Sequence, residues 1–435
     1  MIGILKNILK KYASAIVWTY QPEIIAITGS VGKTSAKDAI FAVVSNRGES
    51  SLSEKARWRV RKSKGNFNNE IGIPLNIIGE WSDADLKLIS REQPPKTKRL
   101  QKAFFWLRVL ITALVRTFIP RRKTYPQVLV LEYGADRPGD IKYLVSMARP
   151  KVAVVTAIGE TPSHIEFYAD AEAVAKEKGK LVEALPAGGW AILNADDPLV
   201  IEMRERTRAR IKTFGFEAGA DVRISQFENR SIAGRPAGIA FKIESEGSFV
   251  PVTLGNAFGR AQAYSIAAAF AVGITFGLNL VEIAELIERY YVPAKHRTNL
   301  VEGIKGTWII DDSYNAAPLS VREALNTLGD LEGNRKIAVL GDMLELGEYS
   351  TDAHESIGKM VPASADILFT VGPRGKFIAE SAIAAGMSRS QVQAFDTVGE
   401  MLAKVQNTIE QGDVVLVKAS RAMALDKVVD EIKLY

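Results

Sequence analysis

Short apolar runs that alternate with helical patterns are the feature that most limits how this chain can fold. They are rich in β-branched residues and leave no polar face for water, which indicates parallel strands covered by helices on both sides. In the first part of the chain these runs lie at 24–28, 128–132, 152–157 and 191–194. The expected fold class is therefore α/β with a mainly parallel sheet.

A second series of the same kind follows the helix break at Pro293. Its helical segments alternate with strands, which predicts a Rossmann-like α/β domain. The expected strands are residues 308–312, 337–341, 367–372 and 414–418. Between the two series, residues 221–253 predict strands with turns at Gly234 and Gly247, and residues 254–277 predict a buried helix rich in alanine.

At 435 residues the chain is too long for one ordinary core. We expect an N-terminal amphipathic helix at 1–22, a central domain at 23–295 and the Rossmann-like domain at 296–435. A hydrophobic fraction of 47% and a charged fraction of 24% are typical of a soluble globular protein. The absence of cysteine excludes disulfides, thiolate zinc sites and cysteine nucleophiles, and it fits a reducing, cytoplasmic compartment.

A basic and apolar insertion is expected at about 87–123. Arg108 and Arg116 interrupt its apolar run, so it lacks the uncharged stretch of about 20 residues that a membrane-spanning helix needs. Two interpretations stay open: an interfacial helix that brings residues 96–123 to the inner face of a membrane, and a surface insertion packed on its own domain. The helix at 1–22 is expected to dock on the next domain, and a membrane anchor is the alternative interpretation. Nucleic-acid binding is not indicated, because the basic stretch is one short, apolar segment.

The best-defined motif is a glycine loop between a strand and a helix. The apolar residues 24–27 are followed directly by Thr28-Gly29-Ser30-Val31-Gly32-Lys33-Thr34-Ser35. Glycines let backbone N–H groups turn toward phosphate oxygens, and the start of a helix adds a positive dipole. Lys33 supplies a charge for the β- and γ-phosphates, and the Thr34 hydroxyl can ligate Mg²⁺. The motif predicts a P-loop ATPase domain, with a loop two residues shorter than the general form.

Five further segments follow in order along the chain. They are residues 66–75, Leu131-Glu132-Tyr133-Gly134, Asp311-Asp312-Ser313-Tyr314-Asn315-Ala316-Ala317-Pro318, Gly341-Asp342-Met343-Leu344-Glu345-Leu346-Gly347 and Lys418-Ala419-Ser420-Arg421. With the glycine loop, they resemble the Mur ligase family of cell-wall peptide ligases over about residues 23–435. Within that family they are most similar to the branch that adds D-alanyl-D-alanine.

The resemblance implies an ATP-dependent amide-bond ligase of peptidoglycan precursor synthesis. Such an enzyme activates a substrate carboxylate as an acyl phosphate, and an incoming amine then displaces phosphate. The implied partners are a UDP-linked muramoyl tripeptide and D-alanyl-D-alanine. The implied cofactors are ATP and Mg²⁺ at two sites. We expect the enzyme to be a monomer.

The resemblance also implies which residues carry the chemistry. The implied catalytic residues are Lys33, Glu132, His164 and Lys178, and Thr34, Glu132, His164 and Lys178 are the implied metal ligands. Lys178, fourteen positions after His164, matches a lysine that is carbamylated in the family. Only a neutral amine adds CO₂, and the resulting carbamate is a hard oxygen ligand suited to Mg²⁺. Lys176 is the alternative in the other register.

Nucleotide contacts are implied for the loop and for the second domain. Arg297 would reach the phosphates, Asp312 would bind the ribose hydroxyls, and Tyr314 and Asn315 would lie near the adenosine. The full implied set is Gly29, Ser30, Val31, Gly32, Lys33, Thr34, Ser35, Arg297, Asp312, Tyr314 and Asn315. The implied substrate contacts are Asn68, Asn69, Lys418, Ser420 and Arg421. His354 is expected to be structural.

The chain departs from the resembled pattern in three places besides the insertion. One is Ala157-Ile158-Gly159, where the family usually has Asn-Ile-Gly before the histidine. The glycine loop is reached by Gly29, so the UDP-binding domain that ordinarily precedes it is expected to be missing. The family's His-Asn pair beside the alanine-rich helix is replaced around 259–262. Two other functions therefore stay open: a Mur-type ligase with a different acceptor, lipid-linked or otherwise modified, and a catalytically weak ATP-binding subunit.

Overall fold

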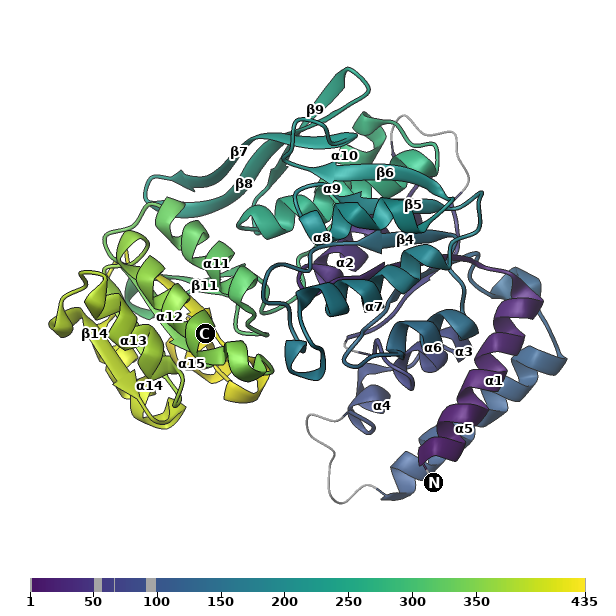
Figure 1. The fold of residues 1–435 in the computed structure, drawn as a ribbon, viewed down its shortest axis with the longest axis horizontal. Helices are drawn as coiled ribbons and strands as arrows, with labels where there is room; N and C mark the ends of the chain where they lie inside the picture. The colour runs from purple at the N-terminus through teal and green to yellow at the C-terminus, as the bar shows by residue number, and fades with distance from the viewer. Residues whose placement is uncertain (1, 51–56, 66, 91–98, 435) are drawn as a thin grey trace.

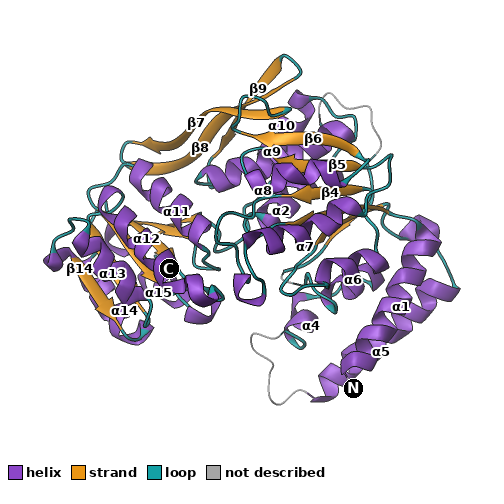
Figure 2. Cartoon of the chain, in the orientation of Figure 1, coloured by secondary structure: helices purple, strands orange, loops and turns teal. Residues whose placement is uncertain are grey.

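The computed structural model describes residues 2–50, 57–65, 67–90 and 99–434. Two sheets organise these residues, each with helices on both faces (Figure 1 and Figure 2). The first has nine strands in the order β2-β3-β1-β4-β5-β6-β7-β8-β9, and the second has six in the order β10-β11-β15-β12-β13-β14. Most neighbouring strands are parallel, so the expected α/β fold class is confirmed.

The parallel part of the first sheet places strand ends next to one another. In β1 and β3, Ile27 lies beside Glu132, and in β1 and β4, Thr28 lies beside Val155. β4 is two residues shorter than predicted, because the Thr156 hydroxyl donates to the carbonyl of Val31 and the chain turns there. The strands are β1 (Glu23–Thr28), β2 (Val60–Lys62), β3 (Val128–Glu132), β4 (Val152–Val155), β5 (Trp190–Asn194) and β6 (Arg210–Gly215).

Alternate residues of β1 face two different cores, as expected for a buried parallel strand. Ile25 and Ile27 pack on a helical layer formed by α2 (Lys33–Ser45), α9 (Arg260–Thr275) and α10 (Leu280–Tyr290). Ile24 and Ala26 face the opposite layer. That layer consists of α1 (Ile2–Tyr20), α3 (Gly72–Ile78), α5 (Arg99–Phe118), α6 (Asp140–Met147) and α7 (Ala171–Glu183).

An antiparallel extension completes the first sheet. The predicted strand-rich segment forms β7 (Val222–Ile232), β8 (Arg235–Ser245) and β9 (Ser248–Leu254). Gly234 and Gly247 lie in its turns with φ of 74° and 77°, so the predicted turn positions are confirmed. The predicted alanine-rich helix is α9, which begins only at Arg260 because the preceding residues complete β9 and a short loop.

The second sheet is parallel apart from its first strand, which pairs antiparallel with the next. Its strands are β10 (Asn299–Glu302), β11 (Trp308–Asp311), β12 (Lys336–Gly341), β13 (Ile367–Val371), β14 (Val392–Phe395) and β15 (Val414–Lys418). One face packs on α11 (Pro318–Asp330), α12 (Ser350–Met360) and α13 (Gly375–Ala384). The other packs on α14 (Val398–Thr408) and α15 (Asp426–Ile432).

The remaining elements are short. They are α4 (Asp83–Lys87), α8 (Pro198–Ile201) and the 3₁₀ turns η1 (Arg122–Thr124), η2 (Ile165–Phe167), η3 (Glu202–Arg206), η4 (Ile304–Gly306), η5 (Gly347–Tyr349), η6 (Val361–Ala363), η7 (Arg389–Gln391) and η8 (Arg421–Met423).

Helices α1 and α5 pack against each other and against α3. α1 buries Leu9, Ala13 and Ile16, so the predicted docking of the N-terminal helix is confirmed. α5 lies within the predicted basic insertion; the part of that insertion at 91–98 lies outside the described residues. None of the described helices is both long enough and apolar enough to cross a membrane.

Candidate active site

The glycine loop joins β1 to α2 at the carboxyl edge of the first sheet. Gly29 has a φ of 145°, and a Cβ built there would lie 2.1 Å from the Thr156 hydroxyl, so only glycine fits without a rearrangement. Gly32, at φ 87°, turns the chain into α2, which begins at Lys33. The Ser30 N–H donates to the carbonyl of Ala157 over 2.6 Å. The loop is therefore held against the end of β4.

Polar groups of this loop are suited to an anion. The Lys33 ammonium donates to the loop's own carbonyls, at 2.8 Å from Gly29 O and 3.2 Å from Ser30 O. Burial lowers the pKa of Lys33, and the charge of Glu132 partly opposes that shift. Ser30 Oγ is buried and has no hydrogen-bond partner among the described residues. An unpartnered buried hydroxyl is costly, and a phosphate oxygen would satisfy it. The residues present therefore fit a nucleotide phosphate.

Glu132 ends β3 beside the loop and is only 2% exposed. Its carboxylate accepts hydrogen bonds from Thr34 Oγ1 at 3.0 Å and from Asn68 Nδ2 at 3.1 Å, and Lys37 Nζ lies 3.5 Å away. Burial alone would raise its pKa, but the charges of Lys37, Lys33 and Arg297 more than offset this, and the pKa falls below its ordinary value. A buried carboxylate that stays ionised beside a hydroxyl is an oxygen donor set suited to Mg²⁺.

His164 lies at the start of η2 with φ 65° and contacts acids from both halves of the chain. Its Nδ1 is 2.7 Å from Glu345 Oε2 of the second unit, and its Nε2 is 3.6 Å from Asp136 Oδ1. Within the described part of the chain, no hydrogen bond or ion pair joins His164 to Glu132 or Lys178. Among the same residues, no three His, Asp or Glu side chains are grouped closely enough to bind a metal ion. Of the four predicted ligands, the structure brings Thr34 and Glu132 into contact.

Lys178 lies on the buried side of α7 and is 2% exposed. Burial, and after it the positive charge of Lys33, lower the pKa of Lys178 to about 7. The residues that the structure describes offer its ammonium no hydrogen bond or ion pair. Lys176, two positions earlier, is exposed. The helix therefore turns the predicted lysine inward and the alternative one toward solvent.

The second unit brings an arginine and an acid toward the loop. The Arg297 guanidinium lies 4.3 Å from the centre of the Tyr314 ring and is close enough to the loop to lower the pKa of Lys33. Asp312, just after β11, accepts from Lys418 Nζ at 2.6 Å and from the Thr298 N–H at 3.2 Å. Of the two predicted nucleotide contacts, Arg297 lies just before β10 and Asp312 just after β11.

Several predicted substrate contacts have partners within the protein. Asn69 Oδ1 accepts from the N–H groups of Ile71 and Gly72, at the start of α3. Lys418 also donates to the carbonyl of Asn315 at 2.9 Å, Ser420 Oγ accepts from the Leu344 N–H at 2.8 Å, and Arg421 lies 5.5 Å from the Tyr314 ring. The N-terminal residue of the motif at 66–75 lies outside the described residues. His354 is fully buried and accepts from the Met343 N–H at 2.9 Å, so its predicted structural role is confirmed.

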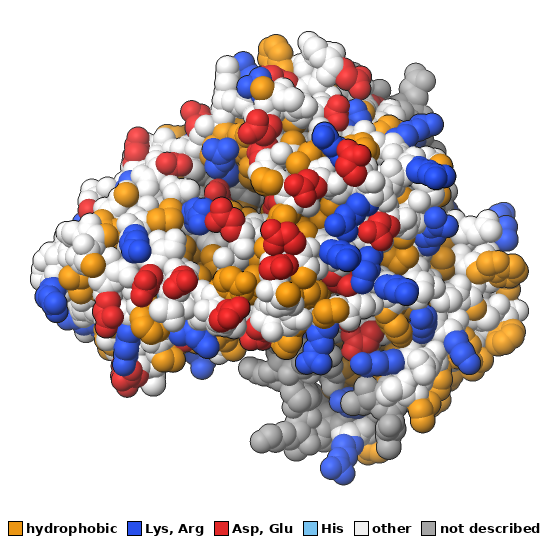
Figure 3. Space-filling view, viewed as in Figure 1, with side chains coloured by type: hydrophobic (Ala, Val, Ile, Leu, Met, Phe, Trp, Pro, Cys, Tyr) orange, Lys and Arg blue, Asp and Glu red, His pale blue; other side chains and the backbone are white. Residues whose placement is uncertain are grey.

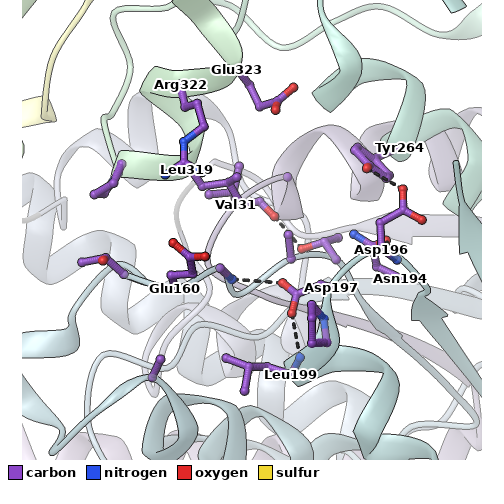
Figure 4. A pocket seen from close by; sticks show the side chains of 18 of the residues that line it. Val31, Glu160, Asn194, Asp196, Asp197, Leu199, Tyr264, Leu319, Arg322 and Glu323 are labelled. Carbon is purple, nitrogen blue, oxygen red and sulfur yellow. Dashed lines mark hydrogen bonds between the residues drawn. The ribbon is translucent and has the colours of Figure 1, made fainter. Parts of the chain in front are cut away.

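A cavity of about 660 Å³ adjoins the glycine loop and is lined by both units. Figure 4 shows Asp196 and Asp197 on one side and Leu319, Arg322 and Glu323 of α11 on another. Tyr264 of α9 donates from its hydroxyl to Asp196 Oδ2 over 2.6 Å. Asp312, Tyr314 and Asn315 do not line this cavity. A cavity of this size can hold a small molecule.

Asp197 fixes one wall of that cavity. Its Oδ2 accepts from the N–H groups of Ile158 at 2.7 Å and Gly159 at 3.0 Å, and its Oδ1 accepts from those of Leu199 and Val200 at the start of α8. One carboxylate therefore joins the segment after β4 to the helix after β5.

Asp197→Ala should lower the thermal unfolding midpoint by about 4–6 °C, because it leaves buried N–H groups without an acceptor at about 2–3 kcal/mol. Differential scanning calorimetry would measure the shift. Glu205→Ala is the control, because that nearby side chain is exposed and should change the midpoint by less than about 1 °C. An unchanged midpoint for Asp197→Ala would contradict the assigned role.

Sequence reasoning missed several charged residues around the site. These are Lys37, Asp136, Asp196, Asp197 and Glu345. Asp196 and Asp197 directly follow a buried strand, so the rule that identified Glu132 could have found them. Lys37 lies one helical turn after Lys33. Glu345 lies within the motif at 341–347, but its contact with His164 depends on how the two units meet, which no local pattern encodes.

Comparisons with known proteins agree with this geometry. The family model for the Mur ligase middle domain matches residues 114–273, and the model for the Mur ligase glutamate ligase domain matches residues 296–421. The second match begins just before β10 and includes the whole six-stranded sheet.

Similar proteins match over nearly the whole chain. A UDP-N-acetylmuramoyl-tripeptide–D-alanyl-D-alanine ligase of Bacillus subtilis is 29% identical over 98% of this chain and 79% of its own length. The protein of the same name from Mycobacterium bovis is 30% identical over 94% of this chain and 72% of its own length. The crystal structure of MurF ligase from Thermotoga maritima in complex with ADP has a TM-score of 0.75 and 25% identity, covering 98% of this chain and 83% of that one.

Two α/β units that meet at a glycine loop and a buried strand-end glutamate define an ATP-dependent ligase architecture. The chain belongs to the Mur ligase family.

Proposed function

We propose that this chain is an ATP-dependent ligase of peptidoglycan precursor synthesis, which joins the carboxylate of a muramoyl tripeptide to D-alanyl-D-alanine. The observation that carries the proposal is the contact between Thr34 of the glycine loop and the buried Glu132. Relatives whose names give this activity match 98% and 94% of the chain. The substrates are inferred from the names of the relatives. The side chains of the site are suited to binding ATP and Mg²⁺.

The nucleotide would lie between a central domain at 23–295 and a C-terminal Rossmann-like domain at 296–435. In this arrangement Lys33 and the loop hold the phosphates, Arg297 adds a second positive charge from the other domain, and Asp312 faces the ribose. Lys33 is positioned to stabilise negative charge that develops on the transferred phosphoryl group. Tyr314, stacked under Arg297, keeps that guanidinium in place.

Thr34 and Glu132 would hold one Mg²⁺, and His164 with a carbamylated Lys178 would hold a second. Bound Mg²⁺ supplies charge neutralisation at the phosphates and at the carboxylate that is activated. Asn68 donates to Glu132 and so fixes the orientation of the carboxylate. To bind the metal, His164 would have to break its contact with Glu345, or Glu345 would have to bind the metal as well. The contact between the two units would then be part of the active site.

Carbamylation of Lys178 is supported by its surroundings. A buried amine with a pKa near 7 is largely neutral at pH 8 and can attack CO₂, forming an N–C bond and releasing one proton. The product is a carboxylate-like anion in place of a buried cation that has no described anionic partner. The neighbouring charge of Lys33 would stabilise it. The exposed Lys176 has none of these advantages.

Phosphate release from ATP and Mg²⁺ tests the proposed function directly. The muramoyl tripeptide substrate and D-alanyl-D-alanine are added singly and together, and the product is weighed by mass spectrometry. We expect release only when both are present, with a product heavier by the dipeptide. Phosphate release with a lipid-linked or modified precursor, but not with the UDP-linked one, would support the ligase reaction. It would contradict the proposed substrate. ATP binding without release under any condition would favour an ATP-binding subunit instead.

A further inference from the structure

Helix α5 has two apolar stripes, whereas covering a core requires only one. Phe105, Val109 and Ala113 form the stripe that packs into the protein. A second stripe is exposed and consists of Leu100, Phe104, Leu107, Ile111, Leu114, Val115 and Phe118. At 3.6 residues per turn the two stripes lie about 180° apart on the helix. Phe104 and Phe118 are 66% and 73% exposed, so the fold does not account for the second stripe.

Helix α1 repeats this arrangement beside α5. Its buried side carries Leu9, Ala13 and Ile16, while Ile4, Ile8 and Trp18 are exposed, Trp18 at 79%. The exposed residues of α1 also recur at helical spacing. Figure 3 shows hydrophobic side chains along the lower right margin, over α1 and α5, with lysines and arginines among them. We call the exposed residues of α1, α5 and residues 119–123 the α1–α5 face.

The charges of this face have one sign. Residues 2–20 and 99–123 contain no acidic residue. Lys6 pairs with Glu70 and Arg108 pairs with Asp85, both from neighbouring segments. The exposed basic residues Lys11, Lys102, Arg121, Arg122 and Lys123 form no ion pair within the part of the chain that the structure describes. The face is therefore both apolar and positive.

We propose that the α1–α5 face binds an anionic membrane surface, with the helices lying in the plane of the lipid headgroups. Apolar side chains on a basic helical surface are the combination that such binding requires. Lysine and arginine side chains beside the apolar stripes match the negative potential of anionic lipids. The exposed Trp18 suits the headgroup region.

The positive charge of this face favours an anionic membrane over a second copy of the chain as its binding partner. A second copy of the chain would bring two positive faces together, and like charges across an interface oppose association. An anionic lipid surface has the complementary charge. Figure 1 also places α1 and α5 at the end of the molecule away from the second sheet, so binding there leaves the contact between the two units free.

Flotation with vesicles tests the face on the full chain. The vesicles contain phosphatidylcholine alone or phosphatidylcholine with phosphatidylglycerol. We expect the chain to float with the anionic vesicles, to stay in solution with the neutral ones, and to be released as salt is raised. Vesicle binding is measured without ATP or substrates, so its result is independent of ligase activity.

Two sets of substitutions test the apolar and the basic residues of the face separately, and a third set elsewhere is the control. Phe104→Gln, Ile111→Gln and Phe118→Gln together should weaken binding at least about 10-fold, because each side chain loses apolar burial in lipid. Arg121→Gln, Arg122→Gln and Lys123→Gln together should do the same on anionic vesicles. The matched control is Phe249→Gln with Val292→Gln, which removes two exposed apolar side chains elsewhere and should leave binding unchanged. All replaced side chains are exposed, and circular dichroism would verify that each variant is folded.

Three outcomes would overturn the membrane assignment. They are failure of the native chain to float with anionic vesicles, equal flotation of the apolar-stripe variant, and equal binding to neutral vesicles. A dimer that the Phe104, Ile111 and Phe118 substitutions dissociate, with no vesicle binding, would assign the face to a second copy. Sedimentation velocity of the native chain and that variant would show this.

Discussion

Lys33→Met should lower kcat/KM for ATP-dependent ligation by about 10²- to 10³-fold, the usual effect of removing one preorganised charge from a phosphoryl-transfer site. The Lys33 ammonium is buried beside Glu132 and is held by the carbonyls of Gly29 and Ser30, so it reaches this position without reorganising the loop. Steady-state phosphate release at saturating Mg²⁺ would measure the loss. Most of it should appear in kcat, because the charge matters most when negative charge develops.

Lys151→Met is the control for this substitution. Lys151 lies at the opposite, amino-terminal edge of the same sheet, where it pairs with Glu23 in a solvent-exposed ion pair. Such pairs contribute little, and the variant should keep nearly all activity. If Lys33→Met were as active as the native chain, the glycine loop would not take part in catalysis as proposed.

Lys178→Met should reduce ligation by about 10²-fold or more, because it removes the carbamate that would complete the second Mg²⁺ site. Native activity should also depend on CO₂: in CO₂-depleted buffer it should fall, and added bicarbonate should restore it. The pKa of Lys178 sets the pH range of this effect. As the pH drops below about 7 the amine becomes an ammonium ion, which cannot attack CO₂, so the bicarbonate requirement should rise toward acid pH.

Lys176→Met tests whether the effect is specific to Lys178 or follows the loss of any lysine from α7. It removes an exposed lysine from the same helix and should leave both activity and the bicarbonate requirement unchanged. Nuclear magnetic resonance with ¹³C-bicarbonate would show a carbamate signal in the native chain and in Lys176→Met but not in Lys178→Met. A signal that persists in Lys178→Met, or full activity of that variant, would contradict the carbamate.

Local patterns predicted most of the elements. Strands β3 and β15 begin and end at the predicted residues, since β-branched runs flanked by helical patterns have few alternatives to a buried parallel strand. The same logic placed Glu132 at a strand end beside the glycine loop. The turns at Gly234 and Gly247 were also predictable, because positive φ favours glycine.

Contacts between segments far apart in the chain were not predictable in this way. His164 was expected among metal ligands, yet in the structure it lies against Asp136 and Glu345. Asn69, Lys418 and Ser420 were expected to face substrate, and their side chains bind other parts of the protein. These partners come from other strands, from loops or from the second unit, and no local period or motif encodes which of them meet.

The sequence by itself determined the α/β class, the glycine loop and its lysine, because glycine spacing and buried runs act over a few neighbouring residues. Only the tertiary structure decided that Lys178 rather than Lys176 faces the interior, that Asp197 joins two loops, and that α1 and α5 share one exposed apolar and basic face. The physical reason is that burial, pKa and surface pattern depend on which segments pack together. Packing is a property of the whole chain.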